Sequence, residues 1–275
     1  MKKYIVCIFL LCAAAVSSCG GSRIDSSGQN PEKTGDALRI VSYNVGVFSK
    51  CYDSMQDIAK MMQEMGADVV SLCELDSCNR RHNSFQLDDF VRILGDDKVL
   101  WQYRFGSAMP WNGGAYGIGI ATAHSIRDSF EIKIPKGAGH EPRVCVVAET
   151  ADYVIAAVHL DHKSEEVRME QVKMVTDELK SRYIRSRKPV FLFGDINAVP
   201  DSPTLQYLSQ DWKVLSETSP TYPADNPRKC IDYIMALKNR AGYEVLKTAV
   251  STKFESADVR QTSDHLPVYV DVRIR

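Results

Sequence analysis

From residue 38 onward, short apolar runs alternate with segments in which apolar residues recur every three or four positions. Runs of this length, bounded by polar or turn-forming residues, predict strands, whereas the three-to-four spacing predicts amphipathic helices. We expect strands within the ranges 38–48, 67–76, 99–106, 116–124, 142–150, 153–162, 190–193, 230–236 and 266–274. Strands and helices interleaved in this way predict a mixed α and β protein, and the length of 275 residues allows one or two domains.

Two helices are clear from their end signals. The first covers 54–66 and stops at Gly66, a usual C-terminal cap residue. Its apolar stripe, which we interpret as core packing rather than a cofactor site, is Met55, Ile58, Met62 and Met65. The second is expected to begin after Ser164, because this N-cap residue is followed by the acidic Glu165 and Glu166.

The first residues do not belong to this domain. Lys2 and Lys3 precede an apolar run, 4–16, that is too short to span a bilayer and ends in small residues, as export signals do. The following "VSSC" resembles the lipobox of bacterial lipoproteins, in which the signal is cut before a cysteine that then carries lipid. We therefore expect a signal peptide over 1–18, lipidation of Cys19, and attachment to a membrane of the bacterial cell envelope.

Residues 19–37 are rich in Gly and Ser and lack an apolar period, which predicts a flexible tether before a domain over 38–275. Removal of the signal takes away two lysines and no acidic residue, so the formal net charge falls from −1 to −3. This acidic body lacks the broad basic footprint of a non-specific nucleic-acid binder. We expect a monomer, with nucleic acid as a less favoured partner.

Five cysteines remain after the expected processing. Cys73 and Cys145 lie in apolar runs and are interpreted as core residues. Cys51 and Cys78 follow two strands, and an exported protein would permit a disulfide between them, although the sequence does not require it. There is no C-x-x-C pair to indicate a zinc site.

Polar residues cluster at the ends of the expected strands. Each one alone has an ordinary structural explanation, such as an Asx turn or a satisfied core histidine. Together they supply carboxylates, carboxamides and histidines, the groups needed for hydrolysis of a phosphate ester assisted by a hard divalent ion. The residues are Asn44, Glu74, His159, Asp195, Asn197, Asp232, Asp264 and His265.

Six motifs along the chain resemble, in order, those of the endonuclease/exonuclease/phosphatase superfamily, which is deoxyribonuclease I-like. They are "SYNV" (42–45), "LCELD" (72–76), "VHLDH" (158–162), "GDIN" (194–197), "CIDYI" (230–234) and "SDHLPV" (263–268). The resemblance covers about 38–273 and implies an α+β fold, a four-layer α/β/β/α sandwich of two packed, mainly antiparallel sheets. It also implies a metal-dependent phosphoesterase.

The resemblance implies a role for each matching residue. Glu74 corresponds to the principal Mg²⁺ ligand, with Mn²⁺ as an alternative ion, and Asn44 and Asp264 line the same ion site. Asp195 corresponds to the group that orients or deprotonates the attacking water, and Asn197 to a donor to the phosphate oxygens. Because side chains two apart on a strand face the same side, we expect Asp195 and Asn197 to point together into the site.

The histidines have roles implied in the same way. His265, paired with Asp232, resembles the histidine that contacts the scissile phosphate. His159 resembles the second histidine of the site, and Arg143 a nearby residue that supports substrate binding. A zinc site formed by His159 and His162 is disfavoured, because no cysteine lies nearby to complete the ligand set.

The sequence says less about which substrate is used than about whether the protein can catalyse the reaction. Cys73 stands where the family often has glutamine, and Ala121 to Ala123 replace the more usual Leu-Ser-Arg type. Trp111 could stack on a substrate or touch a membrane, although simple loop packing is preferred. Because few basic residues lie near the motifs, we favour a small or lipid-linked phosphate ester. A secreted nuclease acting on DNA or RNA and a non-catalytic binding lipoprotein are the alternatives.

Overall fold

The structure, a computed structural model, describes residues 32–95, 99–137 and 140–275. The expected signal segment and Cys19 lie outside the described residues. The described end of the predicted tether contacts the domain: Lys33 Nζ donates to Asp68 Oδ1 at 2.8 Å, and Lys247 Nζ donates to the Glu32 carbonyl oxygen at 2.8 Å. Among the described residues, no helix has the length and apolar composition needed to cross a bilayer.

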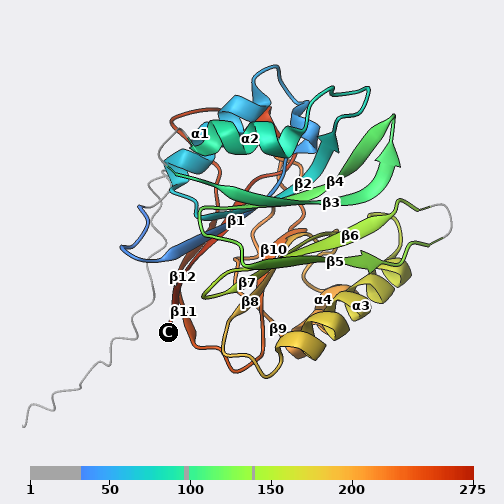
Figure 1. The fold of residues 1–275 in the computed structure, drawn as a ribbon, viewed down its shortest axis with the longest axis vertical. Helices are drawn as coiled ribbons and strands as arrows, with labels where there is room; N and C mark the ends of the chain where they lie inside the picture. The colour runs from blue at the N-terminus through green and yellow to red at the C-terminus, as the bar shows by residue number, and fades with distance from the viewer. Residues whose placement is uncertain (1–31, 96–98, 138–139) are drawn as a thin grey trace, which may run out of the picture.

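Two six-stranded sheets pack face to face, with helices on both outer sides (Figure 1). The first sheet has the order β11-β12-β1-β2-β4-β3, and its strands are β1 (Leu38–Asn44), β2 (Val69–Ser77), β3 (Gln102–Trp111), β4 (Gly114–Thr122), β11 (Tyr243–Val250) and β12 (Val268–Ile274). The second has the order β5-β6-β7-β8-β10-β9, and its strands are β5 (Asp128–Ile134), β6 (Arg143–Glu149), β7 (Val154–His159), β8 (Val190–Asp195), β9 (Trp212–Val214) and β10 (Asp232–Leu237).

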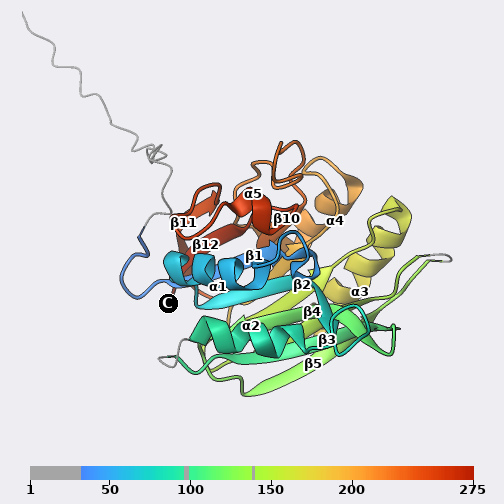
Figure 2. The same ribbon diagram turned by 90° about the horizontal axis from the view of Figure 1, so that it is seen from above.

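The described helices form the two outer layers. Figure 1 shows α1 and α2 over the first sheet and α3 and α4 over the second, while the view from above in Figure 2 places the short α5 beside α1. They are α1 (Ser54–Met65), α2 (Gln86–Gly95), α3 (Glu165–Tyr183), α4 (Pro203–Asp211), α5 (Val259–Thr262) and the 3-10 turn η1 (Gly46–Phe48). The predicted four-layer α/β/β/α sandwich is confirmed.

Strand pairing is antiparallel except at the centre of each sheet. There β1 runs parallel to β2, and β7 runs parallel to β8. Parallel neighbours need a crossover connection, and helices α1 and α3 lie in these two connections. The carboxyl-terminal ends of β1, β2, β7 and β8 therefore lie at one edge of the sandwich.

Three apolar layers hold the sandwich together. Ile58, Met62 and Met65 of α1 are buried against the first sheet, so the predicted methionine stripe is core packing. Ile120 of β4 and Val146 of β6 belong to the layer between the two sheets. A third layer lies between the second sheet and the helices α3 and α4.

The predicted helix ends agree with the structure. Gly66 caps α1 in the left-handed conformation at φ 62°, and the Ser164 side chain accepts a hydrogen bond from Val167 N at the start of α3. Cys73 and Cys145 are fully buried, as expected. Cys51 and Cys78 are both free thiols, so the disulfide that an exported protein would permit is absent between them.

Candidate active site

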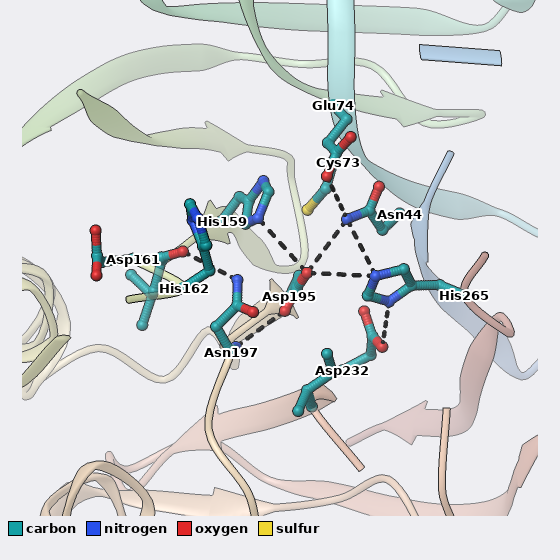
Figure 3. Close-up of polar contacts among 12 residues, drawn as sticks. Asn44, Cys73, Glu74, His159, Asp161, His162, Asp195, Asn197, Asp232 and His265 are labelled. Carbon is teal, nitrogen blue, oxygen red and sulfur yellow. Dashed lines mark hydrogen bonds and ion pairs between the residues drawn. The ribbon is translucent and has the colours of Figure 1, made fainter. Parts of the chain in front are cut away.

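The ends of the central strands surround a cavity of about 760 Å³. Its lining includes Glu74, His159, Asp195, Asp264 and His265, which are contributed by both sheets and by the loop before β12. Figure 3 shows these side chains converging around Asp195, apart from Asp264, which is not labelled there. Residues as far apart in the sequence as Glu74 and His265 thus meet in one place, as the family resemblance implied.

Asp195 lies at the centre of the group and is almost completely buried. Its Oδ2 atom accepts a hydrogen bond from Asn44 Nδ2 at 3.2 Å and faces Nε2 of His159 at 3.5 Å and Nε2 of His265 at 3.7 Å. Burial, followed by the negative charge of Asp232, raises the pKa of Asp195 to about 7. A carboxyl group with this pKa is suited to exchange a proton near neutral pH.

The backbone that presents Asp195 needs glycine before it. Gly194 has φ 141°, and a Cβ there would lie 1.9 Å from the Val158 carbonyl oxygen of the neighbouring strand. Strand β8 ends at Asp195, and Asn197 follows it with φ 54°. The period-two argument for Asn197 was therefore wrong, because this residue lies beyond the strand.

Asn197 reaches the cavity by a turn instead. Its backbone N–H donates to Asp195 Oδ1 at 2.9 Å, and its Nδ2 atom donates to the Leu160 carbonyl oxygen at 3.1 Å. The side chain still lines the cavity. Its role as a donor to phosphate oxygens stays a prediction.

His265 and Asp232 form a buried pair that joins the two sheets. His265 Nδ1 lies 2.9 Å from Asp232 Oδ2, and the same oxygen accepts a hydrogen bond from Thr221 Oγ1 at 2.5 Å. Burial alone would lower the pKa of His265, but the charge of Asp232 and its hydrogen bond, with the charge of Asp195, raise this pKa to about 10. The imidazole is thus a cation at neutral pH and can face a phosphate anion.

His159 has the opposite electrostatic environment. Burial and then the positive charge of Arg143 hold its pKa well below the usual value. Arg143 Nη1 lies 3.2 Å from His159 Nδ1, and Nη2 lies 3.3 Å from His162 Nδ1. A guanidinium has only donors, so both Nδ1 atoms must accept. A neutral His159 then carries its proton on Nε2, which faces Asp195.

Glu74 occupies an irregular position in β2. It lies at a bulge between Cys73 and Leu75 with φ 62°, which turns its carboxylate out of the strand register and into the cavity. Asn44 Nδ2 donates to Glu74 Oε1 at 3.0 Å, while Asn44 Oδ1 accepts from Gly46 N at 3.1 Å. Asn44 Nδ2 therefore faces the carboxylates of Glu74 and Asp195, and the role of Asn44 as a metal ligand, which needs Oδ1 to face the ion, stays a prediction.

The residues present fit a hard divalent cation. Glu74, Asp195 and Asp264 place carboxylates on one cavity, and the Oδ1 atom of Asp232 is buried without a hydrogen-bond partner among the described residues. Carboxylate oxygens of Asp195 and Asp232 lie within 4.8 Å of each other and of the His265 imidazole. Hard cations such as Mg²⁺ prefer oxygen ligands of this kind.

Some contributors to the site were missed from the sequence. Thr221 hydrogen-bonds Asp232, and Ser263 Oγ donates to the Asn44 carbonyl oxygen at 2.6 Å. Ser263 directly precedes Asp264, so its position beside a predicted site residue could have indicated it. Thr221 carries no local signal. For Trp111 simple packing within a loop was preferred over stacking on a substrate, but this residue ends β3, is 40% exposed and lines the cavity.

Comparison with known proteins decides the family. The model of the endonuclease/exonuclease/phosphatase family matches residues 41–265, a range that contains every predicted site residue except Cys19. The chain belongs to this family. This endonuclease/exonuclease/phosphatase protein is therefore a hydrolase of phosphate-ester bonds, and the family is typically metal-dependent. A search of curated protein sequences finds no significant match.

Solved structures share the fold of this family member at low sequence identity. A family protein from Beutenbergia cavernae is 21% identical with a TM-score of 0.68, over 86% of this chain and 72% of that one. A mannosyl-6-phosphatase from Bacteroides thetaiotaomicron is 18% identical with a TM-score of 0.67, over 86% and 100%. The human Nocturnin catalytic domain is 17% identical with a TM-score of 0.63, over 88% and 96%.

Proposed function

We propose that this protein is a Mg²⁺-dependent hydrolase of small phosphate esters in which Asp195 activates the attacking water. The observation that carries the proposal is the position of Asp195, a buried carboxyl with a pKa raised to about 7, between a neutral and a cationic histidine. A binding protein has no physical need for this arrangement. Mn²⁺ is the alternative ion.

Each side chain has a distinct task in the proposed reaction. A bound cation, held by Glu74 and Asp264, would supply positive charge to the phosphate and the leaving oxygen. Asp195 orients the water and accepts its proton at Oδ2. The cationic His265, fixed by Asp232, faces the non-bridging oxygens, where negative charge increases during attack.

His159, Arg143 and Asn197 support these groups. The Nε2–H of His159 is a neutral donor on the other side of Asp195, and Arg143 fixes that tautomer. We place Arg143 in the substrate-binding group, because its guanidinium lines the cavity beside His159 and His162. Asn197 adds a donor close to Asp195.

The charges of the cavity favour a compact substrate over a nucleic acid. Among the described residues, four Lys or Arg side chains line it. Three of these are paired with carboxylates: Arg81 with Asp76, Arg143 with Glu141 and Arg168 with Glu165. Binding along a nucleic-acid backbone requires several cations that are free to contact successive phosphates. A volume of about 760 Å³ is in the range of sites for single small molecules.

A side-by-side assay tests the proposal. The purified protein is incubated with Mg²⁺, Mn²⁺ or a chelator at fixed salt, with duplex DNA, single-stranded RNA, phospholipid head groups and soluble phosphate esters as substrates. We expect Mg²⁺-dependent turnover of small esters. Salt-sensitive cleavage of nucleic acid alone would make the protein a nuclease, and tight binding without turnover of any ester would make it a binding lipoprotein.

Replacing Glu74 by Gln tests the metal assignment. The amide keeps the shape and the hydrogen bond from Asn44 but removes the negative charge, so we expect the Mg²⁺ concentration for half-maximal activity to rise by about tenfold or more. Titration calorimetry of Mg²⁺ gives a readout without substrate. The matched control is Glu166→Gln on the outside of α3, which should leave both values unchanged. Equal Mg²⁺ affinity in Glu74→Gln and the parent would remove Glu74 from the ion site.

Replacing Asp232 by Asn tests the charge state of His265. The parent should show an alkaline limit of kcat/KM near the pKa of about 10, above which His265 loses its proton. Since Asp232 raises this pKa, Asp232→Asn lowers it, and the alkaline limb should move to lower pH. An unchanged limb in the variant would show that His265 does not act as the cation.

We also propose that the protein is an exported lipoprotein held on a membrane of the bacterial cell envelope through Cys19. The support is the lysine-flanked apolar run followed by "VSSC". In a bacterial host, the parent should sediment with membranes, whereas Cys19→Ser should be released or left unprocessed. One acyl chain binds only marginally, so stable anchoring implies more than one on Cys19. An unmodified mature terminus beyond Cys19, seen by mass spectrometry, would refute the anchor.

A further inference from the structure

One wall of the cavity has no task in the proposed reaction. It is formed by Arg81 from the loop after β2, Trp111 and Tyr116 from the β3–β4 hairpin, and Glu141 from the segment before β6. The phenol of Tyr116 has a raised pKa, because of burial and then the charge of Glu74, and Arg143 and Glu141 also act on it. Tyr116 and Glu74 line the same cavity, so this wall adjoins the reaction centre.

Arg81 is fixed before any ligand binds. Its Nε and Nη2 atoms donate to the two carboxylate oxygens of Asp76 at 2.7 and 2.8 Å, and Asp76 is fully buried. Asp76 Oδ2 also lies 2.7 Å from His82 Nδ1. The Arg81 side chain remains 39% exposed, with Nη1 outside the pairing. A guanidinium held in this way loses little conformational freedom when it donates to a ligand.

The hairpin that carries Trp111 is locked to the Arg81 loop. Arg80 N donates to the Asn112 carbonyl oxygen at 3.0 Å, and Asn79 Nδ2 donates to the Ala115 carbonyl oxygen at 3.2 Å. A Cβ on Gly114 would lie 2.2 Å from the Ser77 carbonyl oxygen, so only glycine allows this approach. The guanidinium of Arg81 lies 5.9 Å from the ring centres of both Trp111 and Tyr116. These contacts hold Arg81, Trp111 and Tyr116 in place relative to one another, although they lie at the surface.

The chemistry of the wall combines three features. Trp111 offers an exposed ring face, Arg81 offers fixed donors, and Glu141 offers a carboxylate that is 43% exposed and lies 3.1 Å from Arg143 Nη2. A polyhydroxylated ring matches all three, because its C–H face packs on an aromatic ring while its hydroxyls accept from a guanidinium and donate to a carboxylate.

Other leaving groups match less well. An acyl lipid needs a continuous apolar wall, whereas this wall combines its aromatic rings with the charges of Arg81 and Glu141. A polyanion needs excess positive charge, but Asp76 and Glu141 each offset a neighbouring arginine. We propose that Arg81, Trp111 and Glu141 form a subsite for the leaving group, and that this group is a polyhydroxylated ring, a sugar or a cyclitol. The proposal rests on the phosphoesterase function proposed above.

Substrate selectivity tests the subsite. The detergent-solubilised full-length protein is assayed with Mg²⁺ on a hexose 6-phosphate, myo-inositol 1-phosphate, glycerol 3-phosphate, lysophosphatidic acid and methyl phosphate. We expect the highest kcat/KM for the hexose 6-phosphate or for myo-inositol 1-phosphate. Which of these two ring esters is preferred distinguishes a sugar from a cyclitol. In Trp111→Ala, the ratio of kcat/KM for that ester to the value for methyl phosphate should fall by about tenfold. Trp111→Phe should retain most of the parental ratio.

A matched control separates a local effect from a general one. Tyr52 is 99% exposed and outside the cavity lining, so Tyr52→Ala removes a surface aromatic residue and should leave the ratio unchanged. Equal losses on all esters in Trp111→Ala, or a preference for the lipid or the acyclic ester, would overturn the subsite. Both outcomes leave the phosphoesterase assignment standing.

Binding without turnover separates the two proposals. Of the three tryptophans, Trp101 and Trp212 are buried and Trp111 is exposed, so a ligand on the wall should change the fluorescence of Trp111. In a metal-free buffer, the ring phosphates should give a saturable change that methyl phosphate does not give and that Trp111→Phe abolishes. This change without turnover of any ester would support the subsite and refute the hydrolase. No change in the parent would refute the subsite.

Discussion

Replacing Asp195 by Asn is expected to lower kcat by about 10²- to 10⁴-fold, the contribution typical of a positioned general base. The amide has the same shape but cannot take a proton from water. Asp195 Oδ1 accepts from Asn197 N, and Oδ2 accepts from Asn44 Nδ2. An amide has only one oxygen, so one of these contacts is lost, with a cost in stability of about 1–3 kcal/mol.

Activity and stability must be measured together for this variant. We expect thermal unfolding to show a folded protein at the assay temperature, while turnover at saturating substrate and Mg²⁺ is lost. The matched control is Asp201→Asn, an exposed position six residues later, which should keep the parental rate. Near-parental turnover in Asp195→Asn would show that another group activates the water.

Replacing Arg39 by Met is expected to lower the free energy of unfolding by about 3–5 kcal/mol, the cost of breaking a buried ion pair from one side. Arg39 is 1% exposed in the middle of the first sheet. Its Nε and Nη2 atoms donate to the two oxygens of Asp271 at 2.6 and 2.7 Å, and Nη1 donates to the Met65 carbonyl oxygen at the end of α1. The substitution leaves the Asp271 carboxylate buried without its partner.

Urea unfolding measures this effect, and two further variants define its origin. Arg92→Met removes the exposed side of the Arg92–Asp88 pair on α2 and should cost less than about 1 kcal/mol. The double variant Arg39→Met with Asp271→Leu should recover much of the loss, because it leaves no unpaired buried charge. A single variant as stable as the parent would mean that Asp271 finds other partners or water.

The main features of the fold were predictable because apolar spacing determines which faces are buried. The central strands and the helices α1 and α3 follow the expected ranges closely. Edge elements were missed: β5 and β11 are only partly buried and have mixed polar sequences, and α2 follows a polar loop. Local patterns report burial, so an element with one face in water gives a weaker pattern.

The site was predictable as a set of residues but not as a geometry. The positions of Asp195 and His265 in the chain indicated that they belong to the site. The charge state of each histidine could not be predicted, because the pKa of His159 depends on Arg143 and that of His265 on Asp232. Both of these residues lie on other strands. The turn that presents Asn197 and the bulge that presents Glu74 also depend on neighbouring strands. Non-local contacts of this kind leave no regular spacing in the sequence.

The apolar layer between the two sheets has a consequence for the rate of the reaction. Asn44 and Glu74 are carried by the first sheet, whereas His159, Asp195 and Asp232 are carried by the second. The layer that contains Ile120 and Val146 therefore sets the alignment of the two halves of the site. A large-to-small substitution in this layer would leave an empty space far from the substrate. The two sheets could then shift against each other by fractions of an ångström. Loss of packing in this layer should therefore lower turnover well before the chain unfolds.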